Sequence, residues 1–563
     1  MPASKETLAR RIDQALGRTP ADLVIKDARL LNLVTGEIDA GDIAIAGDTV
    51  VGIHDTYRGR VEIDGRGAVV VPGFVDAHVH VESSLMAPAG FEDAVLPRGT
   101  TTAVCDPHEI ANVLGPDGIR FILDAAETLR LDLRVQLSSC VPSTALETSG
   151  ARLEAADLAA LRGRARALGL AEVMNVPGVL AKDDGLLAKL AAFQDAPIDG
   201  HAPLVGGRDL NAVIACGVRS CHESTSLPEA REKLRKGMHA LIREGSVARN
   251  LAALAPLITE TTAPFTALCT DDRNPLDIAE EGHIDHLVRR AIALGAPVTA
   301  VYRAASWSAA QLYGLTDRGL VAPGRRADLV LLDDLETCAI RSVIKDGRPV
   351  GDEAAAPVAP PDRALRSVRL APVTPELFAA PVPQPTAVIG VAEGTLLTER
   401  VDLTPPARGA DPARDVLMLA VLERHGVNGN VARGFVHGFG LPRGALAGSV
   451  GHDSHNVIVV GADAGDMAAA VNRVTELQGG FVAMLDGKVV AELALPLAGL
   501  MSLQPLAEVV ARLRHLRDAS RALGCRLADP FQTLAFLPLP VIPHLRLTDR
   551  GLVDVDRFRL LAA

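Results

Sequence analysis

The stretch PGFVDAHVH, residues 72–80, decides the fold of this chain. Its apolar part, 73–77, favours a buried β-strand that ends in two histidines one residue apart. Side chains alternate across a strand, so His78 and His80 face the same side. Two such imidazoles at the mouth of a closed parallel sheet can bind a divalent metal ion. Taken alone, the pair is more often explained as surface or hydrogen-bonded histidines.

After this strand, short apolar runs alternate with helical stretches rich in Ala, Leu and Arg. The candidate strands are 73–80, 100–106, 134–139, 171–175, 198–201, 218–222, 238–243 and 265–270. Eight strands alternating with helices over about 250 residues predict an α/β fold, a (β/α)8 TIM-like barrel, for residues 71–319. A doubly wound open sheet is the alternative, but no G-x-G-x-x-G follows an early strand.

Both flanks of this region carry β patterns. Residues 1–70 contain strand runs and a hairpin signal at Gly47-Asp48, and 320–370 begins with a strand-like stretch, so together they predict a small β-sandwich. A linker rich in Ala and Pro follows over about 351–385. Residues 386–563 read as a C-terminal α/β domain with a hairpin at Asp486-Gly487.

Composition excludes several classes of protein. Of the 563 residues, 48% are apolar and 22% charged, which argues against general disorder, and a net charge of −12 argues against nucleic-acid binding. The most apolar late stretch, 493–506, is interrupted by Pro, Gly and polar residues, and the N-terminus carries no apolar leader, so no membrane partner is expected. Seven scattered cysteines, an odd number, fit a reduced, cytoplasmic setting.

Metal-ligand residues gather at the expected strand ends. Five of the 15 histidines lie there, accompanied by carboxylates; they are His78, His80, His108, His201 and His222, with Asp106, Glu109, Glu172, Asp271 and Asp272. In this fold catalytic residues come from the carboxyl ends of several strands. Polar groups that cap helix starts would explain any one of these positions but explain the whole set poorly, so metal binding is the preferred interpretation.

The ligand types then suggest a reaction. Glu172 can bridge two cations, with His78, His80 and Asp271 on one and His201 and His222 on the other. Such a pair lowers the pKa of a shared water, and Asp271 beside it can accept and return a proton. The predicted reaction class is metal-assisted hydrolysis.

Several other polar residues have more than one interpretation. Asp272 is expected either at the metal or paired with Arg273, and Glu109 is expected to be a helix-start carboxylate rather than a ligand. Asp106 and His108 either orient the ligands or hold an additional metal. His452 and His455 are expected to be structural, with a reach to the active site as the alternative. His283 and His286 are expected to be exposed or capping.

The ordered motifs resemble the amidohydrolase superfamily and, within it, the bacterial adenine deaminase family. The resemblance covers nearly the whole chain. The stretches that carry it include HVHVESSLM (78–86), GTTTAVCDPHEIANVLG (99–115), EVMNVPGV (172–179), GHAP (200–203), HEST (222–225), REGSVARNL (243–251), CTDDRNP (269–275), PGRRADLVLLD (323–333) and GGFVAMLDGKVVAELALPLAGLMS (479–502).

The resemblance implies hydrolysis of adenine, the small-molecule substrate, to hypoxanthine and ammonia in purine salvage. It implies two Mn²⁺ ions per active site, or Fe²⁺ or Zn²⁺, and a homo-oligomer. The metal ligands it implies are His78, His80, Glu172, His201, His222 and Asp271. The implied catalytic residues are Asp271, Glu223 and His108, and the implied substrate-binding residues are Glu82, Ser83, Asn175 and Asp272. The chain departs from the family at Val176, Cys221 and Asn274, where Tyr, Asp and His are usual, and Cys221 is expected to be buried and to point away from the mouth.

Three other functions compete with this interpretation. Another amidohydrolase reaction, on a different aminopurine or a cyclic amide, would use the same metals, but Glu172 stands where many ring-opening relatives need a lysine. A cytidine-deaminase-type zinc site has the H-x-E of His80 to Glu82 but needs P-C-x-x-C, which the chain lacks. A non-catalytic scaffold would be expected to lose ligands.

Overall fold

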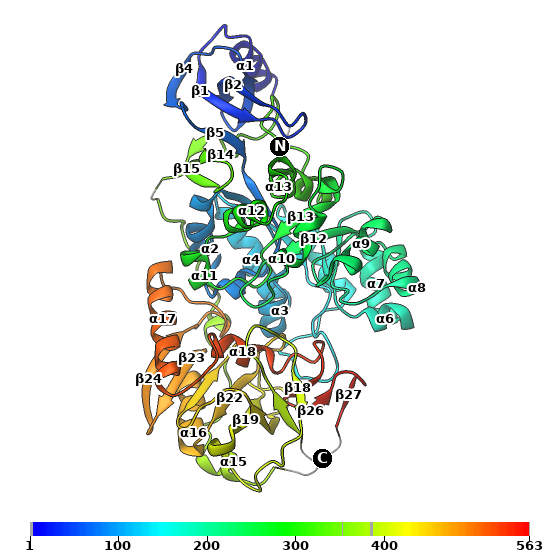
Figure 1. Ribbon diagram of the computed structural model, residues 1–563, viewed down its shortest axis with the longest axis vertical. Helices are drawn as coiled ribbons and strands as arrows, with labels where there is room; N and C mark the ends of the chain where they lie inside the picture. Colours follow the sequence, from blue (N-terminus) through cyan, green and yellow to red (C-terminus); the bar gives the residue numbers. More distant parts are fainter. Residues whose placement is uncertain (1–3, 352, 383–386, 562–563) are drawn as a thin grey trace.

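The computed structural model describes residues 4–351, 353–382 and 387–561. Three sheet regions follow one another along the long axis of the molecule (Figure 1). A sheet built from both flanks of the first two-thirds of the chain lies at one end, the parallel strands lie in the middle, and the C-terminal sheet lies at the other end. The candidate functional residues come from the middle region and from the C-terminal region facing it.

The first sheet unites chain segments that are far apart in sequence. Its strands are β1 (Ala21–Leu31), β2 (Ile38–Ala46), β3 (Thr49–Ile53), β4 (Gly59–Asp64), β5 (Val69–Pro72), β14 (Leu329–Asp334), β15 (Ala339–Lys345) and β16 (Arg348–Pro349). β5 pairs in parallel with β1 and antiparallel with β14, so the strand-like stretch after the middle region rejoins the N-terminal strands, as predicted. These pairings also join all eight strands by hydrogen bonds into one sheet. The hairpin at Gly47-Asp48 links β2 to β3, as predicted.

All eight predicted strands of the middle region are present and parallel. They are β6 (Phe74–Val79), β7 (Thr100–Cys105), β8 (Asp132–Leu137), β9 (Ala167–Val173), β10 (Ile198–Gly200), β11 (Ser220–Cys221), β12 (His239–Arg243) and β13 (Thr266–Cys269). Around them lie the helices α2 (Pro88–Val95), α3 (His108–Leu114), α4 (Pro116–Thr128), α5 (Ala155–Leu161), α6 (Val176–Ala181), α7 (Asp184–Ala192), α8 (Gly207–Ala215), α9 (Leu227–Arg235), α10 (Leu251–Leu254), α11 (Pro275–Glu280), α12 (Ile284–Ala293), α13 (Val298–Ala304) and α14 (Trp307–Leu312). The result is a curled parallel sheet with helices around it.

The parallel strands form two hydrogen-bonded groups, β6 to β10 and β11 to β13. A parallel bridge between Val79 and Asp271 joins the end of β6 to the segment after β13. At the other junction the N–H of Arg219, just before β11, donates to the carbonyl of Ile198 in β10 over 2.9 Å. The two groups therefore touch at both of their edges.

The C-terminal region is built on a mixed eight-stranded sheet. Its strands are β17 (Val388–Gly390), β18 (Glu399–Val401), β19 (Val416–Leu422), β20 (Val431–His437), β21 (Ala445–Gly448), β22 (Val457–Gly461), β23 (Gly480–Leu485) and β24 (Lys488–Ala494). The predicted hairpin at Asp486-Gly487 joins β23 to β24. The helices α15 (Pro375–Ala379), α16 (Ala464–Glu476), α17 (Leu506–Ala522) and α18 (Pro530–Phe536), and the strands β25 (Leu545–Thr548), β26 (Gly551–Asp554) and β27 (Arg559–Leu560), complete it.

The C-terminal region packs directly against the middle region. Met86 and Ser502 form a parallel bridge, and the N–H of Ser502 donates to the carbonyl of Leu85 over 2.7 Å. The N–H of Thr148 donates to the Asp549 carboxylate over 2.8 Å. One apolar cluster contains buried residues of both regions. Within the described ranges, no helix combines the length and the apolar character that a membrane crossing requires.

Candidate active site

The first two site residues lie at the carboxyl end of β6. His78 and His80 are both buried, and their Nε2 atoms lie 3.2 Å apart. His80 Nδ1 donates to the carbonyl of Asp106 over 2.9 Å, because a carbonyl can only accept. His80 Nε2 therefore points toward Asp271, 3.1 Å away. A divalent cation between this nitrogen and the carboxylate would take the place of the proton that they otherwise share.

Glu172, at the end of β9, stands between two pairs of imidazoles. Its Oε1 lies 3.8 Å from His78 Nε2 and 3.4 Å from His80 Nε2. Its Oε2 lies 2.9 Å from His201 Nδ1 and 3.3 Å from His222 Nε2. The carboxylate therefore presents one oxygen to each pair, which is the geometry of a ligand shared by two cations.

Asp271 completes the group from the segment after β13. Its Oδ1 lies 3.4 Å from His78 Nε2, and its Oδ2 accepts a hydrogen bond from Arg243 over 2.8 Å. Burial pushes the pKa of Asp271 upward, but the positive charge of Arg243 and the hydrogen bonds of His78 and His80 together outweigh burial, and the pKa lies well below its usual range. Asp271 is therefore an anion with one oxygen turned to the imidazoles.

These side chains fit a pair of divalent cations. Overlapping triads of their ligand atoms lie within 4.8 Å of one another, namely His78, His80 and Glu172; Glu172, His201 and His222; and His78, His222 and Asp271. The buried Nδ1 of His222 also lacks a hydrogen-bond partner among the described residues. Imidazole nitrogens and carboxylate oxygens suit several first-row divalent metals. The structure thus brings all six predicted ligands together.

Arg243 is a site residue that sequence reasoning missed. It lies at the end of β12, and its guanidinium binds the Glu223 carboxylate through both Nη atoms as well as Asp271. Burial raises the pKa of Glu223, but the charges of Arg243, His201 and His222 together outweigh burial and lower the pKa to about 2. Its position within REGSVARNL, at a strand end, was the available signal.

Glu109 lies at the start of a helix, as predicted, but it also has partners that the sequence did not indicate. Glu109 does lie in the first turn of α3, but its Oε1 is 2.7 Å from His452 Nδ1 and its Oε2 hydrogen-bonds His455 Nε2. The helix-dipole argument considers only the local chain, whereas these two histidines arrive from the C-terminal region. The C-terminal region therefore reaches the active site through His452 and His455. Of the two predictions for this pair, the sequence favoured a structural role over such a reach.

His108 connects Glu109 to the six predicted ligands, which are called the metal-ligand group below: His78, His80, Glu172, His201, His222 and Asp271. Its Nδ1 lies 3.0 Å from the Asp106 carboxylate and 3.3 Å from Glu172, while its Nε2 lies 3.3 Å from Glu109. Both ring nitrogens thus face carboxylates. This arrangement favours a hydrogen-bonded imidazolium that orients its neighbours over a ligand of an additional metal.

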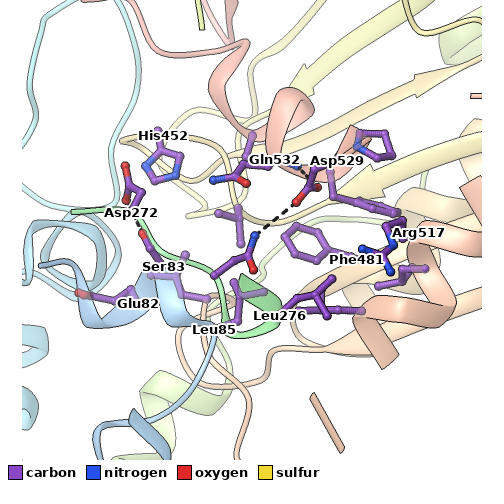
Figure 2. Close-up of a pocket in the computed structure, with 18 of the residues that line it drawn as sticks. Glu82, Ser83, Leu85, Asp272, Leu276, His452, Phe481, Arg517, Asp529 and Gln532 are labelled. Carbon is purple, nitrogen blue, oxygen red and sulfur yellow. Dashed lines mark hydrogen bonds between the residues drawn. The ribbon is translucent and has the colours of Figure 1, made fainter. Parts of the chain in front are cut away.

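The site opens into two adjoining cavities. One contains the metal-ligand group, and the other, shown in Figure 2, lies between the middle region and helices α17 and α18. The second cavity is mostly apolar, with walls that include Leu85, Leu276 and Phe481. Glu109, Asp272 and His452 line both cavities and so mark their junction.

Three of the four predicted substrate-binding residues line the second cavity. Asp272 accepts a hydrogen bond from the Ser83 hydroxyl. It does not form the ion pair with Arg273 that was one of its two expected roles. Arg273 instead binds the carbonyl of Gly282 and a neighbouring glutamate. Glu82 accepts one bond from the backbone of α3, and burial followed by the charge of Glu109 raises its pKa to about 7.

The fourth, Asn175, does not join them. Its Oδ1 accepts a hydrogen bond from the N–H of Gly178 over 2.9 Å and so caps helix α6. Because the side chain makes this capping bond, it does not line the cavity. Val176 is buried in an apolar cluster, whereas Asn274 lines the second cavity and donates to Asp529 over 3.5 Å (Figure 2). Cys221 is fully buried, as predicted.

The expectation for His283 is also wrong. Its side chain is fully buried, 2.9 Å from the Thr100 hydroxyl and 3.3 Å from the Asp76 carboxylate. The polar residues around it in sequence suggested exposure, but helix α12 turns this end toward the parallel strands. His286 is half-buried, 3.7 Å from Glu281.

Comparison with known proteins agrees with this geometry. Residues 69–350 match the amidohydrolase family, and residues 395–559 match the adenine deaminase C-terminal domain. An adenine deaminase of Cereibacter sphaeroides is 58% identical over 99% of this chain and 100% of its own length, and one of a Methylobacterium species is 59% identical over the same shares. A crystal structure of N-acetylglucosamine-6-phosphate deacetylase from Thermotoga maritima, 18% identical, has a TM-score of 0.45 and covers 59% of this chain and 100% of its own. With this likeness along its full length, the chain belongs to the adenine deaminase family of amidohydrolases.

Proposed function

We propose that this protein is an adenine aminohydrolase, which converts adenine and water to hypoxanthine and ammonia. The observation that carries this function is the convergence of four imidazoles and two carboxylates, Glu172 and Asp271, in one buried group beside a cavity with apolar walls, in a chain of the adenine deaminase family. The exocyclic amine of adenine leaves as water adds to C6, so the site must bind a flat heteroaromatic ring and manage protons. The residues present suit both demands.

The metal would be held by side chains already in position. His78, His80 and Asp271 face one place and His201 and His222 another, with Glu172 between them. The proposed metal is Mn²⁺, two ions per site, with Fe²⁺ and Zn²⁺ as the alternatives. When bound, such a pair supplies activation of water for attack at C6.

Asp271 is the proposed proton carrier. Arg243 fixes its Oδ2, which leaves Oδ1 to take a proton from the attacking water and to pass it to the departing amine nitrogen. Glu223 shares Arg243 with Asp271 and so sets the orientation of both. His108 links Glu172 to Glu109 and is proposed to relay protons between them.

Residues of the second cavity are proposed to hold the ring. Glu82 has one buried oxygen, Oε2, without a partner in the described part of the chain, and this oxygen is available for a ring nitrogen. Ser83 and Asp272 form a second polar group at the same wall. Asn175 would act only indirectly, by fixing the start of α6 beside Glu172.

We further infer the architecture that this chemistry uses. The contacts at Val79–Asp271 and Arg219–Ile198 support closure of the eight parallel strands into a (β/α)8 barrel over 71–319. The proposed units beside it are a β-sandwich domain, 1–70 plus 320–370, and a C-terminal domain, 386–563. Cytoplasmic purine salvage by a homo-oligomer is the proposed setting.

An ammonia-release assay tests this function. The metal-replete protein is given adenine, adenosine, 6-substituted purines, cytosine, dihydroorotate and hydantoin with Mn²⁺ present. Adenine is expected to give ammonia and hypoxanthine at the highest kcat/KM. Turnover of a different aminopurine or of a cyclic amide in preference to adenine would replace the proposed function with another amidohydrolase reaction.

A further inference from the structure

His452 lies where the two cavities meet, yet it belongs to the C-terminal region. It follows β21 in the loop that leads to β22, and it lines the cavity of the metal-ligand group as well as the apolar one. Figure 2 shows its ring beside Asp272 at the wall of the apolar cavity. A ring that extends from the apolar cavity to the metal-ligand group would therefore lie beside this imidazole.

The imidazole of His452 is fixed on one edge and on one face. Its Nδ1 is 2.7 Å from Glu109 Oε1, and because a carboxylate only accepts, Nδ1 carries the proton of that bond. The ring of Phe536 stacks on it, with the centroids 4.3 Å apart and the planes at 10°. These two contacts hold the ring in a single orientation and leave Nε2 as its remaining polar atom.

The other two imidazoles on Glu109 have no such free atom. His455 Nδ1 accepts from the N–H of Gly451 over 3.3 Å, so its proton is on Nε2 and is donated to Glu109. His108 turns both nitrogens to carboxylates. His452 Nε2 has no hydrogen-bond partner in the ranges that the structure describes, and this atom is accessible from the cavity. Of the three, only His452 offers a polar atom to the cavities.

We propose that His452 is a substrate-contacting residue of this active site, whose Nε2 forms a hydrogen bond with a nitrogen of the heteroaromatic ring. Glu109 is its positioning residue, and His455 fixes Glu109 in turn. Burial lowers the pKa of His452, but the charge and hydrogen bond of Glu109 together with the charges of Asp272 and Asp453 outweigh burial and raise the pKa to about 9, which agrees with a ring that can donate at both nitrogens. This inference rests on the proposed adenine hydrolysis.

Three features agree with a flat ring as the partner of Nε2. The adjoining walls are apolar, with Leu85, Leu276 and Phe481 on them. Asp272 stands beside His452 and can accept where His452 donates, so the junction presents a donor and an acceptor together. A purine edge also places ring acceptors next to a donor group. The C-terminal region would then supply part of the recognition of the base.

Two substitutions of His452 separate this role from a structural one. The amide nitrogen of His452→Asn can replace Nδ1 and keep the bond to Glu109, but nothing replaces Nε2. The longer His452→Gln places its amide near the Nε2 position and gives up the bond to Glu109. We expect His452→Asn to lose about 10-fold to 100-fold in kcat/KM for adenine, mainly through KM, and His452→Gln to lose less.

Independent measurements accompany the kinetics. Hypoxanthine binding to the metal-replete variants, measured by calorimetry, is expected to weaken in the same order, while metal content and Tm stay those of the wild type for His452→Asn. The matched control is His544→Asn, since His544 pairs with Asp556 on the surface of the same region and is expected to match wild type. Wild-type values for His452→Asn, or a larger loss in His452→Gln than in His452→Asn, would overturn the inference. Failure of the proposed function would instead appear as no ammonia from adenine with the wild-type protein.

Discussion

Asp271 and Val79 form a parallel β-bridge across the junction of β6 and β13. The N–H of Asp271 donates to the carbonyl of His78 over 2.9 Å, and the N–H of His80 donates to the carbonyl of Asp271 over 3.3 Å. Because Val79 lies between the two histidines, this bridge sets both imidazoles against the Asp271 carboxylate. The backbone therefore fixes the proposed proton carrier relative to the first two proposed metal ligands.

Asp271→Asn tests the proton carrier. Asp271 has φ +55°, a left-handed conformation that asparagine also tolerates, so the backbone bridge is expected to remain. An amide cannot accept and return the proton, and kcat is expected to fall by about 1,000-fold or more, while both metal ions stay bound. Steady-state kinetics and metal analysis measure the two effects. Near-normal turnover in a variant with full metal content would assign proton transfer to a different residue.

Metal removal tests the ligand group as a whole. The cations bind the folded state, in which carboxylate and imidazole atoms lie 3.1 to 3.8 Å apart, and not the unfolded chain, in which these atoms are dispersed. The chelated protein is expected to lose ammonia release and to melt at a lower temperature. Each cation restored at a hundredfold excess over its Kd should return about 2.7 kcal/mol to the free energy of unfolding. Titration of Mn²⁺ against activity is expected to saturate at two ions per chain, and a chelated protein with unchanged Tm and activity would contradict the site.

The strands and their terminal ligands could be predicted because each depends on local pattern. Apolar runs of strand length located all eight strands of the middle region, and period-two alternation put His78 and His80 on one side. The six ligands follow strand ends, so topology alone brought them near one another. Family motifs then supplied the reaction.

What the sequence could not reveal depends on contacts between distant segments. The role of Glu109 required knowing that the loop holding His452 and His455 folds onto α3. Arg243 was hidden because an arginine at a strand end has no distinctive spacing to the acids it binds. Asn175 was placed in the site by its neighbourhood in sequence, whereas capping α6 settled its side chain. Burial of His283 likewise follows from the packing of α12.

Lys233 and Cys221 give a prediction about a buried contact next to His222 in sequence. The Lys233 ammonium is fully buried, 3.3 Å from the Cys221 sulfur and 2.8 Å from the Glu229 carboxylate. Lys233→Met leaves Glu229 without its partner and is expected to cost about 3 kcal/mol in the free energy of unfolding. Cys221→Asp is expected to change that free energy by less than about 1 kcal/mol, because the new carboxylate meets the ammonium.

The double variant completes this test. With Lys233→Met already present, Cys221→Asp places an unpaired carboxylate in the core and is expected to cost about 3 kcal/mol or more. Denaturant unfolding of the four proteins gives the coupling energy between the two positions. Equal costs of Cys221→Asp with and without Lys233 would show that the ammonium does not act on this position.

Glu147 gives the chain a pH-dependent stability that does not involve the metal-ligand group. Its buried carboxyl accepts from the Ser143 hydroxyl over 2.8 Å, and burial, followed by the charge of Asp453, raises its pKa to about 8 from 4.5. Below pH 4.5 the folded and unfolded states both hold the proton, so the full stability is present. Between pH 4.5 and about 8 the unfolded state releases the proton first, and the free energy of unfolding falls as pH rises.

The variant Glu147→Gln removes this titration. It is expected to be more stable than wild type at pH 8 by about 2 kcal/mol, with a smaller difference at pH 5. Glu336→Gln, on an exposed side chain, is the control and should follow wild type at both pH values. Equal stability of Glu147→Gln and wild type across this range would show that Glu147 keeps its ordinary proton affinity in the folded protein.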